Sequence, residues 1–66
     1  MFCLRFKESH DFSDNPGRVA VTGTLKQISA WARVVGLIFV SKPQYIYKGY
    51  YRDRDGGCYT PDIYSK

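Results

Sequence analysis

Hydrophobic and polar positions alternate strictly in the segment FCLRFK, residues 2–7, where every second residue is a large hydrophobe: Phe2, Leu4 and Phe6. A period of two with β-forming side chains predicts a half-buried strand. The run RVAVT, residues 18–22, alternates in the same way and predicts a second strand. Residues 8–17 between them are rich in turn formers and predict a long polar loop.

The hydrophobic period changes to that of a helix after Gly23. Thr24 and Gln27 fit the capping-box pattern of a helix start, and Gly36 suits the left-handed residue that ends one. The residues between them predict an amphipathic helix of about ten residues. Its apolar positions are Leu25, Ile28, Ala32 and Val35. Trp31 lies on the flank of this helix, where a core position is favoured over an exposed anchor for a partner.

The segment LIFVS, residues 37–41, is an uninterrupted apolar run, which is typical of a central strand covered on both faces. Pro43 ends it. We expect residues 44–52 to resume as an extended chain with a bulge or bend at Gly49, so that Tyr45 and Tyr47 share one face. The turn DRDGG, residues 53–57, then leads into a short strand that Pro61 ends. Residues 60–66 are expected to form a frayed tail.

The order of these elements, β-β-α-β followed by one or two short strands, predicts a small α+β fold in a single domain, residues 1–66. We expect one amphipathic helix packed on a three- to four-stranded sheet whose other face is partly bare. A chain of 66 residues buries only ~60% of the surface that it exposes when unfolded, so a homodimer is one way to enlarge the core.

The charge balance favours anionic partners only modestly. Ten Lys and Arg residues face six acids, for a net charge of +4, and no cluster of one sign is present. Cys3 and Cys58 belong to no metal-binding or redox pattern, and we expect reduced side chains, although a bridge between them stays open if the first and last strands pair. With no signal peptide and no apolar run of ~18–20 residues, the expected location is cytoplasmic, that of the host cell if the chain is phage-encoded.

Residues that carry chemistry do not gather into a catalytic set, so we expect no enzyme, no cofactor and no metal. His10, with Asp11 and Asp14 nearby, offers too few ligands for a metal site and is expected to be a solvated loop residue. The DRDGG segment starts like a calcium loop, but Gly57 stands where an oxygen ligand is required, which favours a hairpin turn.

Tyrosines and cations concentrate in residues 45–54. Such residues can cover an open sheet face, bind another protein or stack on the bases of a nucleic acid. The candidate partner-binding residues are Tyr45, Tyr47, Lys48, Tyr50, Tyr51, Arg52 and Arg54.

The expected function is that of a small protein-binding module that occupies the surface of a larger complex. Free-standing chains of this size without a catalytic set are often phage or mobile-element accessory proteins, so inhibition or modulation of a host defence or transcription machine is the expected role. The alternative is a small basic protein that binds nucleic acid through the same segment, residues 45–54.

Overall fold

The computed structural model describes residues 1–8 and 17–65. The described chain contains five strands and one helix, which follow one another as β1 (Phe2–Lys7), β2 (Arg18–Gly23), α1 (Leu25–Val35), β3 (Ile38–Ser41), β4 (Gly49–Arg52) and β5 (Cys58–Ile63). The candidate loop residues His10, Asp11 and Asp14 lie outside the described residues.

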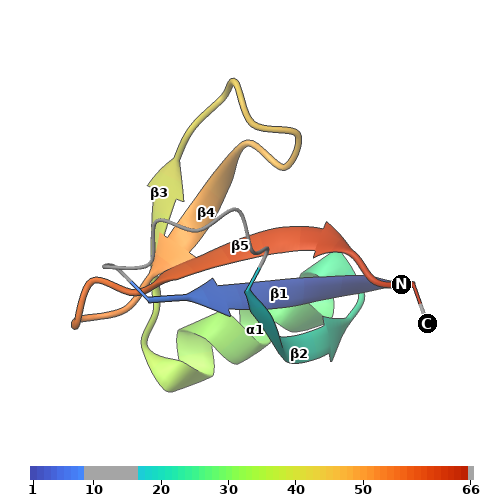
Figure 1. Ribbon diagram of the computed structural model, residues 1–66, viewed down its shortest axis with the longest axis horizontal. Helices are drawn as coiled ribbons and strands as arrows, with labels where there is room; N and C mark the ends of the chain where they lie inside the picture. Colours follow the sequence, from blue (N-terminus) through green and yellow to red (C-terminus); the bar gives the residue numbers. More distant parts are fainter. Residues whose placement is uncertain (9–16, 66) are drawn as a thin grey trace.

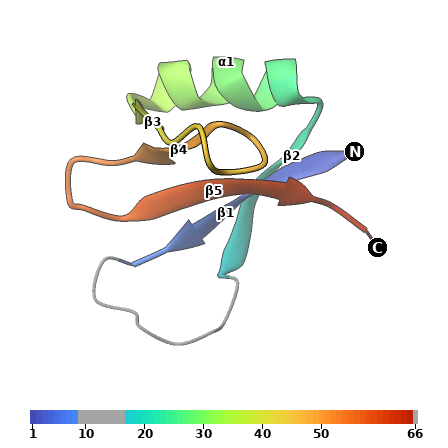
Figure 2. The same cartoon turned by 90° about the horizontal axis from the view of Figure 1, so that it is seen from above.

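The strands form one antiparallel sheet in the order β2-β1-β5-β4-β3, and α1 lies across one of its faces (Figures 1 and 2). β2 and β3 occupy opposite edges, so α1 carries the chain from one edge of the sheet to the other. The α+β single domain with one helix on a sheet is confirmed, with five strands instead of three or four.

The capping residues of α1 act as the sequence predicts. The Gln27 backbone N–H donates to the Thr24 side chain at 3.1 Å, and the Thr24 N–H donates to the Gln27 side chain at 2.9 Å. At the other end Gly36 adopts φ 86°, a left-handed conformation that costs glycine little. The Leu37 N–H then folds back to the Ala32 carbonyl at 2.8 Å, as in a Schellman ending.

The core lies between α1 and the middle of the sheet. Leu4, Ile28 and Ala32 are fully buried there, and Cys3, which the alternation of β1 places on the opposite face from Leu4, is fully buried as well. The Tyr59 ring lies beside the rings of Phe6 and Trp31, with centroid distances of 4.8 and 6.1 Å. Trp31 is half-buried, which fits the expected position on the flank of the core.

The prediction that residues 37–41 form a central strand is wrong, because β3 is an edge strand. Ile38 is 62% exposed and Phe39 50% exposed. The central position belongs to β5, which pairs with both β1 and β4. The order of strands depends on pairings between residues far apart in the sequence, and an apolar run alone does not encode it.

Residues 42–48, which we call the tyrosine loop, are not the extended chain that the sequence predicted. The Lys42 N–H donates to the Lys48 carbonyl at 3.0 Å, and within the loop Tyr45 N–H donates to the Lys42 carbonyl at 2.9 Å. Lys48 takes a left-handed φ of 63° before β4 begins at Gly49. Pro43 fixes the backbone at the start of these turns, so Tyr45 and Tyr47 do not share the face of a strand.

β5 continues through Pro61 to Ile63, beyond the predicted stop. The Tyr64 N–H donates to the Met1 carbonyl at 3.0 Å, so even-numbered residues of β5 bond to β1 and odd-numbered ones face the β4 side. The nitrogen of Pro61 therefore points to the side where the β4 pairing has ended, and no ladder bond is lost. The part of the expected tail up to Ile63 is thus strand.

Both cysteines are free. The first and last strands do pair, but Cys3 lies opposite Asp62 and Cys58 lies opposite Lys7. This register separates the two cysteines by roughly 13 Å along the strands, too far for a disulfide.

Candidate functional site

The tyrosine loop is fixed by aromatic contacts at two points. The Tyr47 ring meets the Phe2 ring edge-on at a centroid distance of 5.7 Å, and the Tyr45 ring lies 6.1 Å from that of Tyr50. Between these anchors Ile46 is 90% exposed. The loop passes beside β5, at the place where the pairing of β4 with β5 has ended (Figure 2). It thus holds one aliphatic side chain in solvent beside the part of β5 that β4 does not cover.

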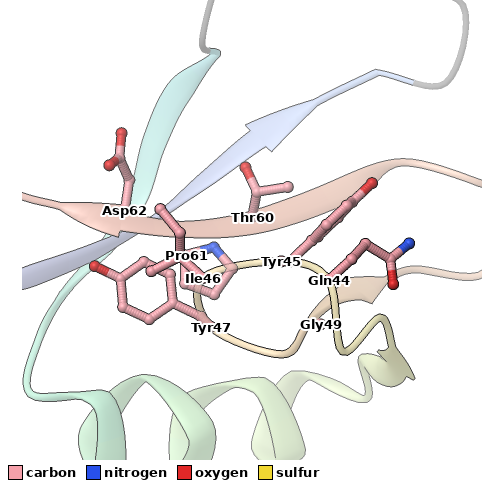
Figure 3. A pocket seen from close by; sticks show the side chains of 8 residues that line it. All are labelled: Gln44, Tyr45, Ile46, Tyr47, Gly49, Thr60, Pro61 and Asp62. Carbon is pink, nitrogen blue, oxygen red and sulfur yellow. The ribbon is translucent and has the colours of Figure 1, made fainter.

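The first of two hollows beside this loop has a volume of about 340 Å³. Figure 3 shows Ile46 and Pro61 in its middle, Asp62 and the Tyr47 hydroxyl toward one end, and Gln44 toward the other. Its lining consists of Gln44, Tyr45, Ile46, Tyr47, Gly49, Thr60, Pro61 and Asp62. The arrangement gives an apolar centre with hydrogen-bonding groups at both ends.

The second hollow lies between the loop and α1 and has a volume of about 390 Å³. Ile46, Tyr47 and Pro61 line both hollows, so the loop forms a ridge between them. The other residues of the second hollow are Leu25 and Ile28 of α1, Phe39 and Tyr51 of the sheet, and Lys48 at the end of the tyrosine loop. This lining is apolar apart from Lys48 and the tyrosine hydroxyls.

The edge of β5 that faces the first hollow presents no free N–H group at Pro61 or Ile63. Pro61 has none, and the Ile63 N–H donates to Asp62 Oδ1 at 2.7 Å. The other carboxylate oxygen, Oδ2, accepts from Arg5 Nε at 3.3 Å. Because an antiparallel ladder needs donors as well as acceptors, an added strand cannot pair fully here.

The candidate residues predicted from the sequence lie at several separate places in the structure. Tyr45 and Tyr47 line the first hollow, Lys48 and Tyr51 line the second, and Tyr50 packs against Tyr45. Arg52 and Arg54 lie apart from the tyrosine loop, at the end of β4 and in the turn after it. The tyrosines and arginines therefore do not form one continuous aromatic and basic surface.

Several residues of the site were missed by sequence reasoning. The expected extended chain would put Ile46 on the face opposite Tyr45 and Tyr47. Pro61 and Asp62 were assigned to the tail. A lone aliphatic residue between two tyrosines, three positions after Pro43, was the available signal for a loop tip, since proline favours a turn.

In the turn between β4 and β5, the Asp53 carboxylate accepts hydrogen bonds from backbone N–H groups of the same turn. Asp53 Oδ1 accepts from the N–H groups of Asp55 and Gly57 at 3.0 and 2.7 Å, which confirms the predicted hairpin turn. The ionisation of Tyr59 is affected by its surroundings. Burial of the ring raises the pKa of Tyr59, the Asp53 charge raises it further, and the Arg18 charge lowers it. Among residues 1–8 and 17–65, no group of His, Cys, Asp and Glu side chains is arranged to hold a metal ion.

The helix α1, with 11 residues, is too short to cross a lipid bilayer, and the described chain has no other helix. No protein-family model, no curated protein and no solved structure matches the chain.

Proposed function

We propose that the protein is a non-enzymatic binding module whose partner is a protein, and that it binds through the tyrosine loop and the two hollows. The observation that carries the proposal is the position of Ile46, which is 90% exposed on a ridge between two largely apolar hollows. An exposed aliphatic side chain next to apolar concavities is typical of a protein interface.

The backbone of the site favours docking of side chains over addition of a strand. Pro61 and the bonded N–H of Ile63 leave only carbonyl acceptors on this edge of β5. A partner therefore fills the hollows with apolar or aromatic side chains and donates hydrogen bonds to the rim, where Thr60 and Asp62 offer side-chain oxygens.

Nucleic acid is the less favoured partner. The rings of Tyr45, Tyr47 and Tyr51 each lie beside another aromatic ring of the protein, so a base would have to compete for their faces. Arg52 and Arg54 lie apart from the tyrosine loop and cannot serve the same short stretch of phosphates.

The form of action that suits so small a module is occupation of a surface on a larger complex. Inhibition or modulation of a host defence or transcription machine by a phage or mobile-element protein, in the cytoplasm, is the role that we propose for it.

A matched pair of variants tests the site. Ile46→Asp places a charge on the ridge, and Val34→Asp places the same charge on α1, where Val34 is 86% exposed. Proteins captured from source cells by the native chain should be retained by Val34→Asp and lost with Ile46→Asp, as measured by quantitative mass spectrometry. Equal capture by both variants would show that the tyrosine loop is not the interface.

A salt titration tests the nucleic-acid alternative. Fluorescence anisotropy with generic single-stranded DNA and RNA should show no binding even at low salt. Tight binding that weakens steeply with salt, and that Tyr47→Ala and Arg52→Ala abolish, would displace the protein-partner proposal, because contacts with phosphates release counterions.

A further inference from the structure

Two of the free strand edges of the sheet are protected against pairing with another chain. On β5, Pro61 and the Asp62 side chain remove the outward donors. On β2, the register with β1 shifts so that Ala20 has no partner, and this bulge bends the outer edge. Bulges, prolines and blocked donors are the usual means by which proteins prevent edge-to-edge association.

The edge of β3 has none of these protections. Ile38–Ser41 contains no charge, no proline and no bulge. The bond from Lys42 N–H to the Lys48 carbonyl fixes the alternation, so Ile38 and Val40 bond to β4 while Phe39 and Ser41 direct their N–H and C=O groups outward. Within the described part of the chain, these outward groups have no backbone partner.

We propose that β3 pairs antiparallel with β3 of a second copy of this chain, around a two-fold axis at Phe39. Phe39 of each copy then exchanges both backbone hydrogen bonds with Phe39 of the other. Ile38 of one copy lies opposite Val40 of the other, an aliphatic pair. The two five-stranded sheets join into one continuous sheet.

The ends of β3 fit this register. Leu37 of one copy lies opposite Ser41 of the other, and its carbonyl accepts the Ser41 N–H. The Leu37 N–H already donates to the Ala32 carbonyl and therefore needs no acceptor from the second copy. Every outward donor of the segment is therefore satisfied in the pair.

Charge also favours a second copy. Lys42 of each copy lies opposite Gly36 of the other, where α1 ends and the helix dipole is negative. No cation of one copy is placed directly opposite a cation of the other in residues 36–42. The strand of an unrelated protein would not, as a rule, place a cation opposite Gly36.

Exposed apolar side chains also lie on and next to β3. Val35, Ile38 and Phe39 are all at least 50% exposed, and a second copy paired with β3 would cover part of this surface.

Analytical ultracentrifugation across a concentration series tests the stoichiometry, with three variants. The native chain should sediment as a dimer at high concentration. Ile38→Lys adds one cation to each strand at an exposed position, and Ser41→Pro removes an outward N–H that the monomer does not use; both should be monomeric with unchanged circular dichroism. Ser41→Ala is the matched control and should remain dimeric.

Amide hydrogen exchange tests the register. Between about 10 µM and about 1 mM protein, exchange at Phe39 and Ser41 should slow by about tenfold or more. Exchange at Val40, which is bonded to β4 in either state, is the internal reference and should change far less.

A native chain that stays monomeric at ~1 mM, or a dimer that persists in both Ile38→Lys and Ser41→Pro, would overturn the proposal. Protection of Phe39 and Ser41 only in the presence of another protein would assign the edge to a foreign strand and would overturn it as well. Because Ile46 lies outside β3, loss of the dimer leaves the capture experiment on the tyrosine loop interpretable.

Discussion

Asp62 accepts the backbone N–H of Ile63, the residue that directly follows it, at 2.7 Å, and the same carboxylate pairs with Arg5 on the neighbouring strand β1. One side chain thus closes an outward donor and links two central strands. Because Asp62 is also on the rim of the first hollow, the shape of the candidate site and the protection of the β5 edge depend on the same residue.

Replacement of Asp62 should separate these interactions. Asp62→Ala removes the acceptor for Ile63 and the partner of Arg5, and we expect a loss of about 1 kcal/mol in the free energy of unfolding, because both groups are partly exposed. Asp62→Asn keeps a neutral oxygen acceptor and should lose about half as much. Urea denaturation measures both. Equal losses in the two variants would mean that the hydrogen bond to Ile63 contributes nothing.

Opening the β5 edge should promote self-association. In the double variant Pro61→Val/Asp62→Ala, positions 61 and 63 both have a free backbone N–H that points outward. Another strand can then pair with this edge of β5. In a background of Ile38→Lys, which blocks the β3 edge, we expect aggregation that increases with protein concentration and is seen by light scattering. The Ile38→Lys variant alone is the control and should remain clear.

Gly49 should tolerate no side chain. A Cβ at this position would collide with the Phe39 ring and the Val40 carbonyl of β3. We expect Gly49→Ala to lower the free energy of unfolding by about 3 kcal/mol. Gly36→Ala is the matched comparison, because nothing lies within 4 Å of the new methyl group and only the left-handed backbone, φ 86°, opposes it. Its loss should be about 1 kcal/mol in thermal or urea unfolding.

Stability should decline at alkaline pH because of Tyr59. Burial of its ring, reinforced by Asp53, raises its pKa in the folded state above the ordinary value of 10.0. The folded state therefore holds this proton more tightly than the unfolded chain. The resulting stabilisation is fully present below pH 10 and is lost as the pH rises through the folded-state pKa.

Urea denaturation at pH 8 and at pH values above 10, on the native chain and on Tyr59→Phe, measures this contribution. The native chain should lose more of its free energy of unfolding than the variant between these conditions. Parallel pH profiles would contradict the assignment of the effect to Tyr59.

Sequence patterns predicted the elements whose signals are local. The helix was defined by Thr24, Gln27 and Gly36, because caps are formed by neighbouring residues. The first two strands followed from strict alternation. The turn at 53–57 followed from its aspartates and glycines.

The sheet order and the shape of the tyrosine loop were not predictable in this way. β3 is apolar enough for a central position, yet the pairing of β5 with both β1 and β4 leaves it at the edge. A proline breaks a strand only where the ladder needs a backbone N–H at that position. Whether position 61 needs one depends on where β4 ends. The candidate site was not predictable for the same reason, since Ile46 and Pro61 come to line one hollow only when the tyrosine loop lies beside β5.

The last strand in the sequence is the middle strand in space. During synthesis, β1 with β2 and β3 with β4 can form hairpins, but no strand pairing joins these hairpins until β5 has left the ribosome and inserted between β1 and β4. The complete sheet is therefore a late event, in which one strand closes two ladders at once. A chain that stops before Cys58 would consequently yield two separate hairpins with open edges and not a smaller version of the domain.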